Sequence, residues 1–338
     1  MESLNSKKNV LITGDKTSRL KFGLSGRIQI LFRNQAYFVP ATVWATMKKQ
    51  LITHKINNLM IDFHKMHGLG NAFILLNEIN PDEYDLRSLA LFLCDRHLGI
   101  GADGIMLVLP SDKADIQMRI INADGSEANM CGNGIRCFAK YVFERGFIRK
   151  ETFSVETLAG IIIPQLMMDH HGVVNSVKVN MGSPKFNPAE IPMLNNKDRV
   201  INAPLEIHGK TYSITSLLMG VPHTMVFVDS LELIDIVTVG KQIEKHPAFP
   251  QGTNVNFVQW INSHEIKVQT WERGAGKTLA CGTGSCASAV ASIINNKTNG
   301  KIVVHLAIGD LEVEWIHDTV FMTGPATNIC SGQIEIKN

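Results

Sequence analysis

Apolar side chains recur at helical spacing in two segments of the chain. Between Ile135 and Phe143 they follow the i, i+3, i+4, i+7, i+8 pattern of one buried helix face, and Gly146 is a suitable residue for that helix to end on. The segment Cys286–Ile294 shows the same pattern. The spacing therefore predicts two amphipathic helices, each packed against the interior by one face.

Other segments alternate between apolar and polar residues, which is the pattern of half-buried β-strands. Gln117–Ile121 and Ile266–Trp271 alternate in this way, and each ends in a loop that contains glycine. Residues 302–308 and 311–315 are predicted to pair as a hairpin that turns at Gly309-Asp310. From Met60 onward we expect many short strands and few helices, in a mixed α/β (α+β) fold.

Almost the same four residues precede both predicted helices. Cys131-Gly-Asn-Gly opens the first helix, and Cys281-Gly-Thr-Gly opens the second helix 150 residues later. Each motif follows a strand and a loop with glycine, so one strand–loop–helix unit occurs twice. We expect two similar domains, each of which presents one cysteine at the start of a helix.

The start of a helix has a specific chemistry. Its unpaired backbone N–H groups and the helix dipole attract anions and favour the thiolate form of a cysteine. The glycines leave room for a ligand carboxylate to approach backbone amides, here those of Gly132, Asn133, Gly282 and Thr283. If the two domains face each other, two cysteines flank one ligand. Such a pair can remove a proton from one face of an amino-acid α-carbon and return a proton to the other face.

Composition narrows the class of protein without revealing its chemistry. The 338 residues are 45% hydrophobic and 19% charged, which is typical of a globular protein of about two domains. No apolar run approaches the roughly 18 residues of a membrane-spanning helix, and a net charge of +2 gives no reason to expect nucleic acid. Six cysteines are too few for a disulfide scaffold, which predicts reduced thiols and a cytoplasmic location.

Charge is distributed unevenly along the chain. Residues 1–59 hold 10 Lys+Arg against 2 Asp+Glu, whereas residues 60–338 hold 23 against 29. The basic segment contains an alternating stretch, Arg27–Phe32, and a short predicted helix, Val43–Leu51, but no chemical motif. We interpret residues 1–59 as an N-terminal extension ahead of a functional part that starts at Met60.

Five motifs follow one another along that functional part. They are Lys65-Met-His-Gly-Leu-Gly-Asn-Ala-Phe73, Gly99-Ile-Gly-Ala-Asp-Gly104, Asn122-Ala-Asp-Gly-Ser-Glu127, Cys131-Gly-Asn-Gly-Ile-Arg-Cys137, and Glu272-Arg-Gly-Ala-Gly276 leading to Cys281-Gly-Thr-Gly284. In sequence and in order, they closely resemble the diaminopimelate epimerase family. The resemblance implies two pseudo-symmetric domains, each a strand-rich barrel around a central helix, with the active site in the cleft between them. It places the first domain at residues 60–176 with about 327–338, the second at 177–326, and residues 1–59 outside the match.

The resemblance also implies a role for individual residues. Cys131 and Cys281 match the two catalytic bases, and His223 and Glu272 match residues that adjust the thiol pKa values. Substrate-binding positions are matched by Asn71, Asn122, Gly132, Asn133, Asn254, Glu272, Arg273, Gly282 and Thr283. One position departs from the family, because this chain has Val221 where members commonly have an asparagine that contacts the distal carboxylate of the substrate.

The implied activity is the cofactor-independent conversion of LL-2,6-diaminopimelate to meso-diaminopimelate, in lysine and peptidoglycan precursor biosynthesis. We expect no cofactor, no metal, no nucleic-acid or membrane partner, and a homodimer. One alternative is a racemase of another polar amino acid on the same fold, because Val221 changes a recognition position. A zinc-binding module using Cys131, Cys137, Cys281 and Cys286 is an alternative of a different class, and its cysteine spacings are loose.

Overall fold

The structure, a computed structural model, describes residues 19–22, 27–32, 35–40 and 59–336. The chain divides into two units, Met1–Ile61 with Gln333–Asn338, and Asp62–Gly332. In the first unit, β1 (Arg19–Phe22), β2 (Arg27–Phe32) and β3 (Gln35–Pro40) form an antiparallel sheet with β2 in the middle. The alternating stretch is thus confirmed as a strand. The helix predicted at Val43–Leu51 lies outside the described residues.

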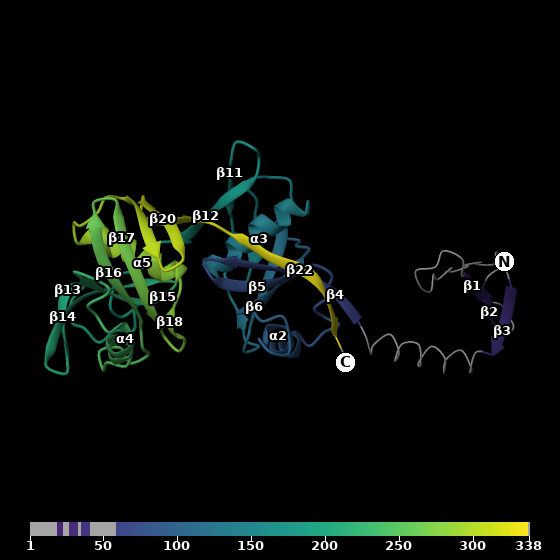
Figure 1. Cartoon of the computed structure of the whole chain (residues 1–338), viewed down its shortest axis with the longest axis horizontal. Coiled ribbons are helices and arrows are strands. Elements are labelled where there is room, and N and C mark those ends of the chain that lie inside the picture. Colours follow the sequence, from purple (N-terminus) through teal and green to yellow (C-terminus); the bar gives the residue numbers. More distant parts are fainter. Residues whose placement is uncertain (1–18, 23–26, 33–34, 41–58, 337–338) are drawn as a thin grey trace, which may run out of the picture. The chain divides into compact units, whose positions relative to one another are not determined.

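The first of two larger sheets lies against helix α3 (Gly132–Glu144), as Figure 1 shows. Its strand order is β10-β9-β7-β6-β5-β4-β22, with β8 paired to β7. Helix α2 (Leu86–Cys94) connects β5 to β6 along the chain. The strands are β4 (Leu59–Gly68), β5 (Asn71–Leu76), β6 (Gly104–Leu109), β7 (Ile116–Asn122), β8 (Glu127–Ala128), β9 (Val155–Thr157), β10 (Gly160–Ile162) and β22 (Thr327–Ile336).

The second sheet packs on helix α5 (Gly282–Ile294) and carries helix α4 (Ile236–Glu244). Its order is β11-β12-β21-β20-β19-β17-β16-β15-β14-β13, with β18 paired to β17. The strands are β11 (Gln165–Met168), β12 (Val174–Gly182), β13 (Val200–Ile207), β14 (Lys210–Met219), β15 (Val221–Val228), β16 (Asn254–Asn262), β17 (Glu265–Glu272), β18 (Gly276–Thr278), β19 (Lys301–Leu306), β20 (Gly309–Ile316) and β21 (Thr319–Gly324). The predicted mixed α/β fold of two similar, strand-rich domains is confirmed.

The internal repeat extends far beyond the cysteine motifs. Helices α2 and α4, and helices α3 and α5, begin and end 150 residues apart. Strand pairing repeats at the same offset, because Phe73 pairs with Gly104 in the first sheet and His223 with Asn254 in the second. Any residue between β5 and α3 therefore has a structural counterpart 150 positions later.

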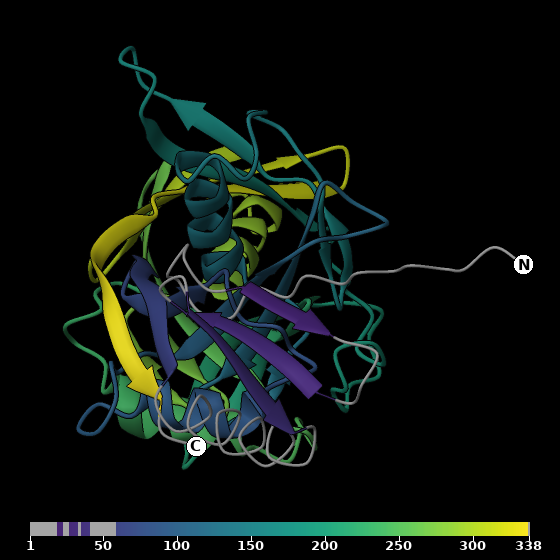
Figure 2. The same cartoon turned by 90° about the vertical axis from the view of Figure 1, so that its right-hand side faces the viewer.

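The two helices at the centre of the repeat are buried more completely than their spacing predicts. Nearly every residue from Gly132 to Val142 and from Gly282 to Ser292 is buried, not one apolar face alone. Ile135, Phe138 and Val142 of α3 are inaccessible to solvent and pack in a core with β5, β6, β7 and β12. In the second domain, Cys286 and Val290 of α5 are equally buried. Figure 2 shows α3 enclosed by strands, in a view turned by 90°. Burial of each helix on nearly all sides fixes the direction in which its start points.

The strands predicted from alternation are confirmed, with one change at a turn. Gln117–Ile121 lies in β7, Ile266–Trp271 lies in β17, and β19 pairs with β20 as a hairpin. However, Leu306 already pairs with Gly309, so the turn is at Ala307-Ile308 rather than at Gly309-Asp310. Gly309 adopts a φ of 141° inside the strand, and Leu69 packs where a side chain at this position would lie. Gly309 is therefore needed for close packing against Leu69 and not for the turn.

Helices α2 and α4 were not predicted from the apolar pattern. Each has nine residues, which is short for recognition by periodicity. The sequence feature that indicates each helix is its N-cap residue. The carboxylates of Asp85 and Asp235 accept hydrogen bonds from the backbone N–H groups of Arg87 and Thr238.

The predicted domain boundary at residue 177 stays a prediction. Strand β12 crosses this position, and it pairs within the second sheet while Val177 and Val179 pack against α3 in the first core. Among the helices of the described residues, none is both long and apolar enough to cross a membrane.

Candidate active site

Each of the two repeated cysteines is the N-cap residue of a buried helix. The backbone of Cys131 and Cys281 is extended, and each sulfur accepts a hydrogen bond of 3.4 Å from the backbone N–H of the residue three positions later, Gly134 or Gly284. A side chain on Gly134 would overlap Met106, and one on Gly284 would overlap Asn256. Glycine at these positions lets the first turn of each helix approach the strand beneath it.

The structure brings the two helix starts together. Helix α3 packs against α5, and a Cβ on Gly282 would lie 3.4 Å from Oδ1 of Asn133. A Cβ on Gly132 would lie 3.0 Å from Cε of Met181, so this glycine also lies in a closely packed region. The charge of one carboxylate, Glu272, acts on both Cys131 and Cys281. The two sulfurs therefore belong to one site.

The pKa of both thiols is raised, contrary to the sequence-based expectation for a helix start. Burial is the largest cause for Cys131 and for Cys281, and the negative charge of Glu272 raises both pKa values further. The backbone N–H groups of Asn133 and Gly134 lower the pKa of Cys131, as the helix start predicts, but their effect is smaller than that of burial. Both residues are therefore held as thiols.

In the first domain, Asn71 contacts the cysteine. Its Oδ1 atom lies 3.5 Å from Sγ of Cys131 and 3.5 Å from Nδ2 of Asn133. Asp103 holds Asn71 in place by accepting hydrogen bonds from Nδ2 of Asn71 at 2.9 Å and from the backbone N–H of Ala72 at 2.8 Å. The supporting role of Asp103 is missed at the sequence level, where a residue next to glycine suggests only a turn.

In the second domain, the polar groups follow the end of β17. The hydroxyl of Thr278 donates to Glu272 at 2.6 Å, and Oδ1 of Asn254 accepts from the backbone N–H of Arg273 at 2.8 Å. The guanidinium of Arg273 is exposed and donates to the carbonyl of Gln251 at 2.8 Å. Most of its donors stay available to an anion.

Three further predicted positions lie at the edges of this site. Asn122, the counterpart of Glu272 at the end of β7, donates to the hydroxyl of Ser126 at 2.9 Å and is half-buried. Thr283 lies beside Cys281, with its hydroxyl 3.6 Å from the sulfur. Val221, the first residue of β15, is 37% exposed and is the counterpart of Asn71.

His223 is fully buried on β15. Its Nδ1 atom lies 3.1 Å from Nδ2 of Asn256, and burial, with a smaller contribution from the charge of Arg273, lowers its pKa to about 3. The imidazole is therefore neutral at physiological pH.

Several buried polar atoms in the described part of the chain have no hydrogen-bond partner. Among the described residues they include Oδ1 of Asn133, Nη2 of Arg136 and Nε2 of His223. Arg136 is inaccessible to solvent, and it donates to the carbonyls of Gly132 at 2.9 Å and Pro325 at 3.1 Å. Such atoms are usually satisfied in proteins, so their presence here is typical of a ligand-binding site.

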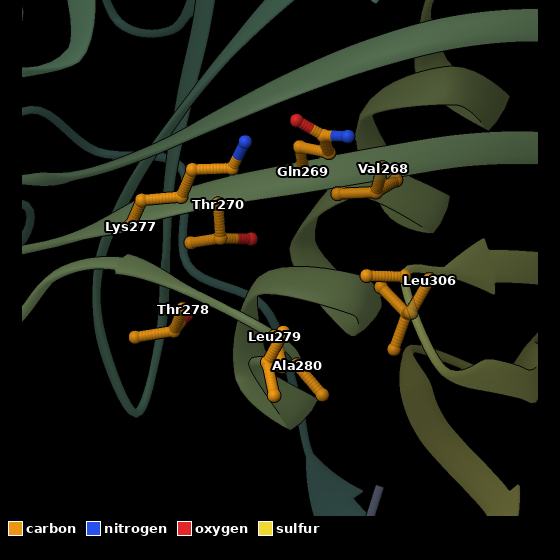
Figure 3. A pocket seen from close by; sticks show the side chains of 9 residues that line it. Val268, Gln269, Thr270, Lys277, Thr278, Leu279, Ala280 and Leu306 are labelled. Atoms are coloured by element: carbon orange, nitrogen blue, oxygen red, sulfur yellow. The ribbon is translucent and has the colours of Figure 1, made fainter. Parts of the chain in front are cut away.

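A cavity of about 270 Å³ lies beside the second helix start but does not include this site. It is formed by β17, β18, the approach to α5 at Leu279 and Ala280, and Leu306 (Figure 3). None of the sequence-predicted catalytic or substrate-binding residues lines it. Thr278, which donates a hydrogen bond to Glu272, connects the two. Thr270 of the cavity lining also donates to Asn256, which lies against Gly284.

The arrangement of the cysteines does not support the zinc alternative. No group of three or more His, Cys, Asp or Glu side chains in the described part of the chain could hold a metal ion. Cys137 and Cys286 lie in the helical cores, and burial raises the pKa of each to about 12.

Comparison with known proteins identifies the family. The sequence model of the diaminopimelate epimerase family matches residues 63–187 and 215–329. The chain belongs to the diaminopimelate epimerase family. Diaminopimelate epimerase of Heliobacterium modesticaldum is 47% identical over 281 residues, which are 82% of this chain and all of that protein. The enzyme of Pelotomaculum thermopropionicum is 50% identical, over 80% of this chain and 98% of its own length.

Solved structures extend the similarity in fold beyond this family. A hydroxyproline epimerase from Agrobacterium vitis covers 82% of this chain and 93% of its own, with a TM-score of 0.62 at 17% identity. A PhzF-family phenazine biosynthesis protein from Bacillus anthracis covers 82% of this chain and 100% of its own, with a TM-score of 0.59 at 15% identity. At these identities the likeness concerns the fold alone. The epimerase family therefore shares its two-domain architecture with other families.

Proposed function

We propose that this protein is an isomerase that converts LL-2,6-diaminopimelate to meso-diaminopimelate with two cysteine bases. The observation that carries the proposal is the pair Cys131 and Cys281, each capping a buried helix of its own domain, with the two helices packed together. Membership of the diaminopimelate epimerase family supports the substrate, and near-complete coverage of relatives at 47–50% identity supports the reaction.

The reaction needs one thiolate and one thiol at the same time. The thiolate of one cysteine takes the α-proton, and the C–H electron pair passes into the carbanion and its carboxylate. The thiol of the other cysteine then donates its proton to the opposite face of the carbon and becomes the thiolate, so protons and electrons balance. The negative charge of Glu272 raises the pKa of both Cys131 and Cys281, so it opposes two thiolates side by side.

Backbone amides would stabilise the carbanion. The N–H groups of Gly132-Asn133 and of Gly282-Thr283 are at the first turns of α3 and α5, where the reacting carboxylate gains negative charge. This preorganised arrangement needs no electron-withdrawing cofactor. We therefore propose that the reaction proceeds without pyridoxal phosphate or a metal.

The other end of the substrate would be recognised by side chains. Arg273 can bind the distal carboxylate through parallel N–H donors, while the amides of Asn71, Asn122 and Asn254 contact the remaining polar groups. Diaminopimelate has an amino-acid group at both ends, so the site requires both a reacting end and a recognition end. The product would serve lysine and peptidoglycan precursor synthesis.

We also propose a cellular compartment and an oligomeric state for the enzyme. All six cysteines, each in the described part of the chain, are free, which supports a reducing compartment, and we propose the cytoplasm. We propose a homodimer on the basis of the family resemblance, and no partner other than the small-molecule substrate.

Incubation of the purified protein with LL-2,6-diaminopimelate in deuterium oxide tests the function. We expect meso product with deuterium at the inverted α-carbon, because the donating thiol exchanges with solvent. A parallel panel of polar amino acids tests the alternative that Val221 suggests. Inversion of another amino acid without inversion of diaminopimelate would favour the alternative, and inversion of none would contradict both.

A further inference from the structure

The turn between β4 and β5 places a leucine in a backbone conformation that leucine rarely adopts. Gly68 pairs with Asn71 across the hairpin. The two residues between them, Leu69 and Gly70, have φ of 54° and 82°. Positive φ at both positions is typical of a type I′ turn, which favours Asn-Gly or Gly-Gly. The turn itself therefore gives no reason for a large apolar side chain at its first position.

The side chain of Leu69 lies in the core of the second domain. Although it is at the tip of a hairpin of the first domain, it is only 4% exposed. It belongs to the buried cluster around α5, whose other fully buried members in the described part of the chain lie between Leu217 and Met322. A Cβ on Gly309 of β20 would come within 2.8 Å of its Cδ2 atom. The first domain thus contributes one side chain to the core of the second.

Close contacts hold the β4–β5 turn on both sides. On one side, a Cβ on Gly68 would lie 2.8 Å from the backbone oxygen of Asn133, in the first turn of α3. On the other side, a Cβ on Gly70 would lie 2.5 Å from Cδ1 of Ile308 and 3.2 Å from Cδ1 of Leu279. Leu279 belongs to the segment between β18 and α5. The turn is therefore held between the start of α3 and the segment that leads into α5.

The internal repeat does not require this arrangement. At the repeat offset of 150 residues, Met219 and Gly220 occupy the turn between β14 and β15. Met219 is buried like Leu69, but it packs in the core of its own domain. The related turn thus forms its hairpin without placing a side chain in the other core, so the position of Leu69 is not a requirement of hairpin formation.

Asn71 follows this turn directly. It is the first residue of β5, and its Oδ1 atom lies 3.5 Å from Sγ of Cys131 and 3.5 Å from Nδ2 of Asn133. Close-packed interiors leave a buried side chain little freedom to move. Burial of Leu69 in the second core therefore restricts the backbone that carries Asn71, two residues later.

We infer that Leu69 is a positioning residue that acts through Asn71. Its insertion into the core of the second domain fixes the start of β5, and with it the amide that contacts Cys131. The consequence for catalysis rests on the proposed function, in which Asn71 binds the substrate. A measurement on the substrate-free protein therefore tests the role of Leu69 separately from that function.

The substrate-free measurement is nitrogen-15 NMR of the asparagine-labelled full chain. The side-chain amide signal of Asn71, assigned with Asn71→Ala, should differ from those of exposed asparagines, because its Nδ2 atom donates to Asp103 at 2.9 Å. Leu69→Gly keeps a residue that the turn favours but removes the apolar side chain, and it should move this signal toward that of an exposed asparagine. Leu69→Met, of similar volume, should leave the signal in place.

The matched control is Ile302→Ala, which truncates a residue of the same core on β19 that is 1% exposed. This change should lower the thermal midpoint without moving the Asn71 signal. A signal that stays in place in Leu69→Gly, or that moves equally in Ile302→Ala, would overturn the inference.

Steady-state kinetics provide the second measurement. Leu69→Gly should raise KM for diaminopimelate about ten-fold, because a binding contact is no longer held in place. Leu69→Met and Ile302→Ala should leave KM unaltered. In an Asn71→Ala background, Leu69→Gly should raise KM no further, and additive effects would contradict the inference. A parent chain that inverts no amino acid would contradict the proposed function, while the amide signal still decides the role of Leu69.

Discussion

At the scale of single residues, the residue that caps each helix differs between the helices outside the proposed active site and the two helices that begin in it. Helices α2 and α4 are capped by Asp85 and Asp235, which are among the preferred capping residues. The two buried helices α3 and α5 are instead capped by Cys131 and Cys281, whose sulfurs are weak acceptors of the 3.4 Å hydrogen bonds that they receive. The weaker cap is present only where a thiol could act as an acid or base.

Replacing either cysteine with serine should therefore remove activity without unfolding the protein. Serine is a better cap, but its hydroxyl is far too weak an acid to exchange the α-proton. We expect Cys131→Ser or Cys281→Ser to lower the epimerisation rate by about 10³-fold or more, with an unchanged thermal midpoint. Cys330→Ser, at an exposed position, is the control. Full turnover by either single variant would contradict the two-base mechanism.

His223 makes the stability of the protein depend on pH. Its pKa is about 3 in the folded state and near 6.5 when unfolded, so between these values the unfolded state binds more protons. The stability is fully present above pH 6.5 and is lost as the pH falls toward 3. We expect urea unfolding to show a loss of about 2 kcal/mol between pH 6.5 and 4.5 from this residue. In His223→Phe this part of the pH dependence should vanish, and an identical slope would contradict the assignment.

Arg273 offers a test of substrate recognition. Its exposed guanidinium keeps donors free for a carboxylate, and an ammonium group cannot reproduce two parallel hydrogen bonds. We expect Arg273→Lys to raise KM for diaminopimelate about ten-fold or more, with a smaller effect on kcat. Steady-state kinetics measure this. A KM equal to that of the unsubstituted protein would show that another group binds the distal carboxylate.

At the scale of elements, a helix residue and the strand residue that it packs against have complementary sizes in each domain. Gly240 of α4 lies against Trp271 of β17, where a Cβ would come within 2.6 Å of Cβ of the indole side chain. Trp271 also donates to Glu244 at 2.6 Å, and it precedes Glu272 in the active site. In the first domain Ala90 takes the place of Gly240, and Ile121 takes the place of Trp271. The helix residue is thus larger and the strand residue smaller than in the second domain.

Gly240→Ala should destabilise the protein although alanine is the better helix former. The gain in helix propensity is about 1 kcal/mol, whereas overlap with a packed tryptophan costs about 1–3 kcal/mol. We expect a net loss of about 1 kcal/mol in urea unfolding, with reduced activity because β17 carries Glu272. Adding Trp271→Ile, which copies the first-domain pair, should relieve the overlap. A single variant that is more stable than the parent would show that the helix can shift without strain.

At the scale of the whole molecule, the proposed chemistry lies in one unit of the chain. All proposed site residues fall between Asn71 and Thr283, within the unit Asp62–Gly332, and the family match begins at residue 63. The three-stranded sheet β1–β3 belongs to the other unit and to none of the matched segments.

A chain that begins at Met60 should therefore fold and keep full activity. Limited proteolysis of the full chain should cut within residues 1–59 before the epimerase domains are cleaved, since the termini of a chain are preferred sites of proteolysis. Epimerase assays and thermal unfolding of both forms provide the comparison. An insoluble or inactive shortened chain would show that residues 1–59 are a structural part of the enzyme.

The sequence by itself determined the features that depend on local periodicity and repetition. The helical spacing around Phe138 and Val290, the alternation in Gln117–Ile121, and the repeated Cys-Gly-x-Gly motif are each contained in a short segment. Together they predicted both central helices, the mixed fold and the placement of the two cysteines at helix starts, because element type follows from the local pattern. The apolar spacing did not predict that both helices are buried on nearly every side.

Only the tertiary structure decided what depends on neighbours distant in the sequence. The helix start alone favours a lower thiol pKa, but burial raises the pKa of Cys281, and burial is a property of the packed whole. The support of Asn71 by Asp103 joins residues 32 positions apart, and the contact of Asn256 with His223 joins residues 33 positions apart. The sequence pattern does not reveal such polar pairs, because strand pairing in the sheets decides which distant residues become neighbours.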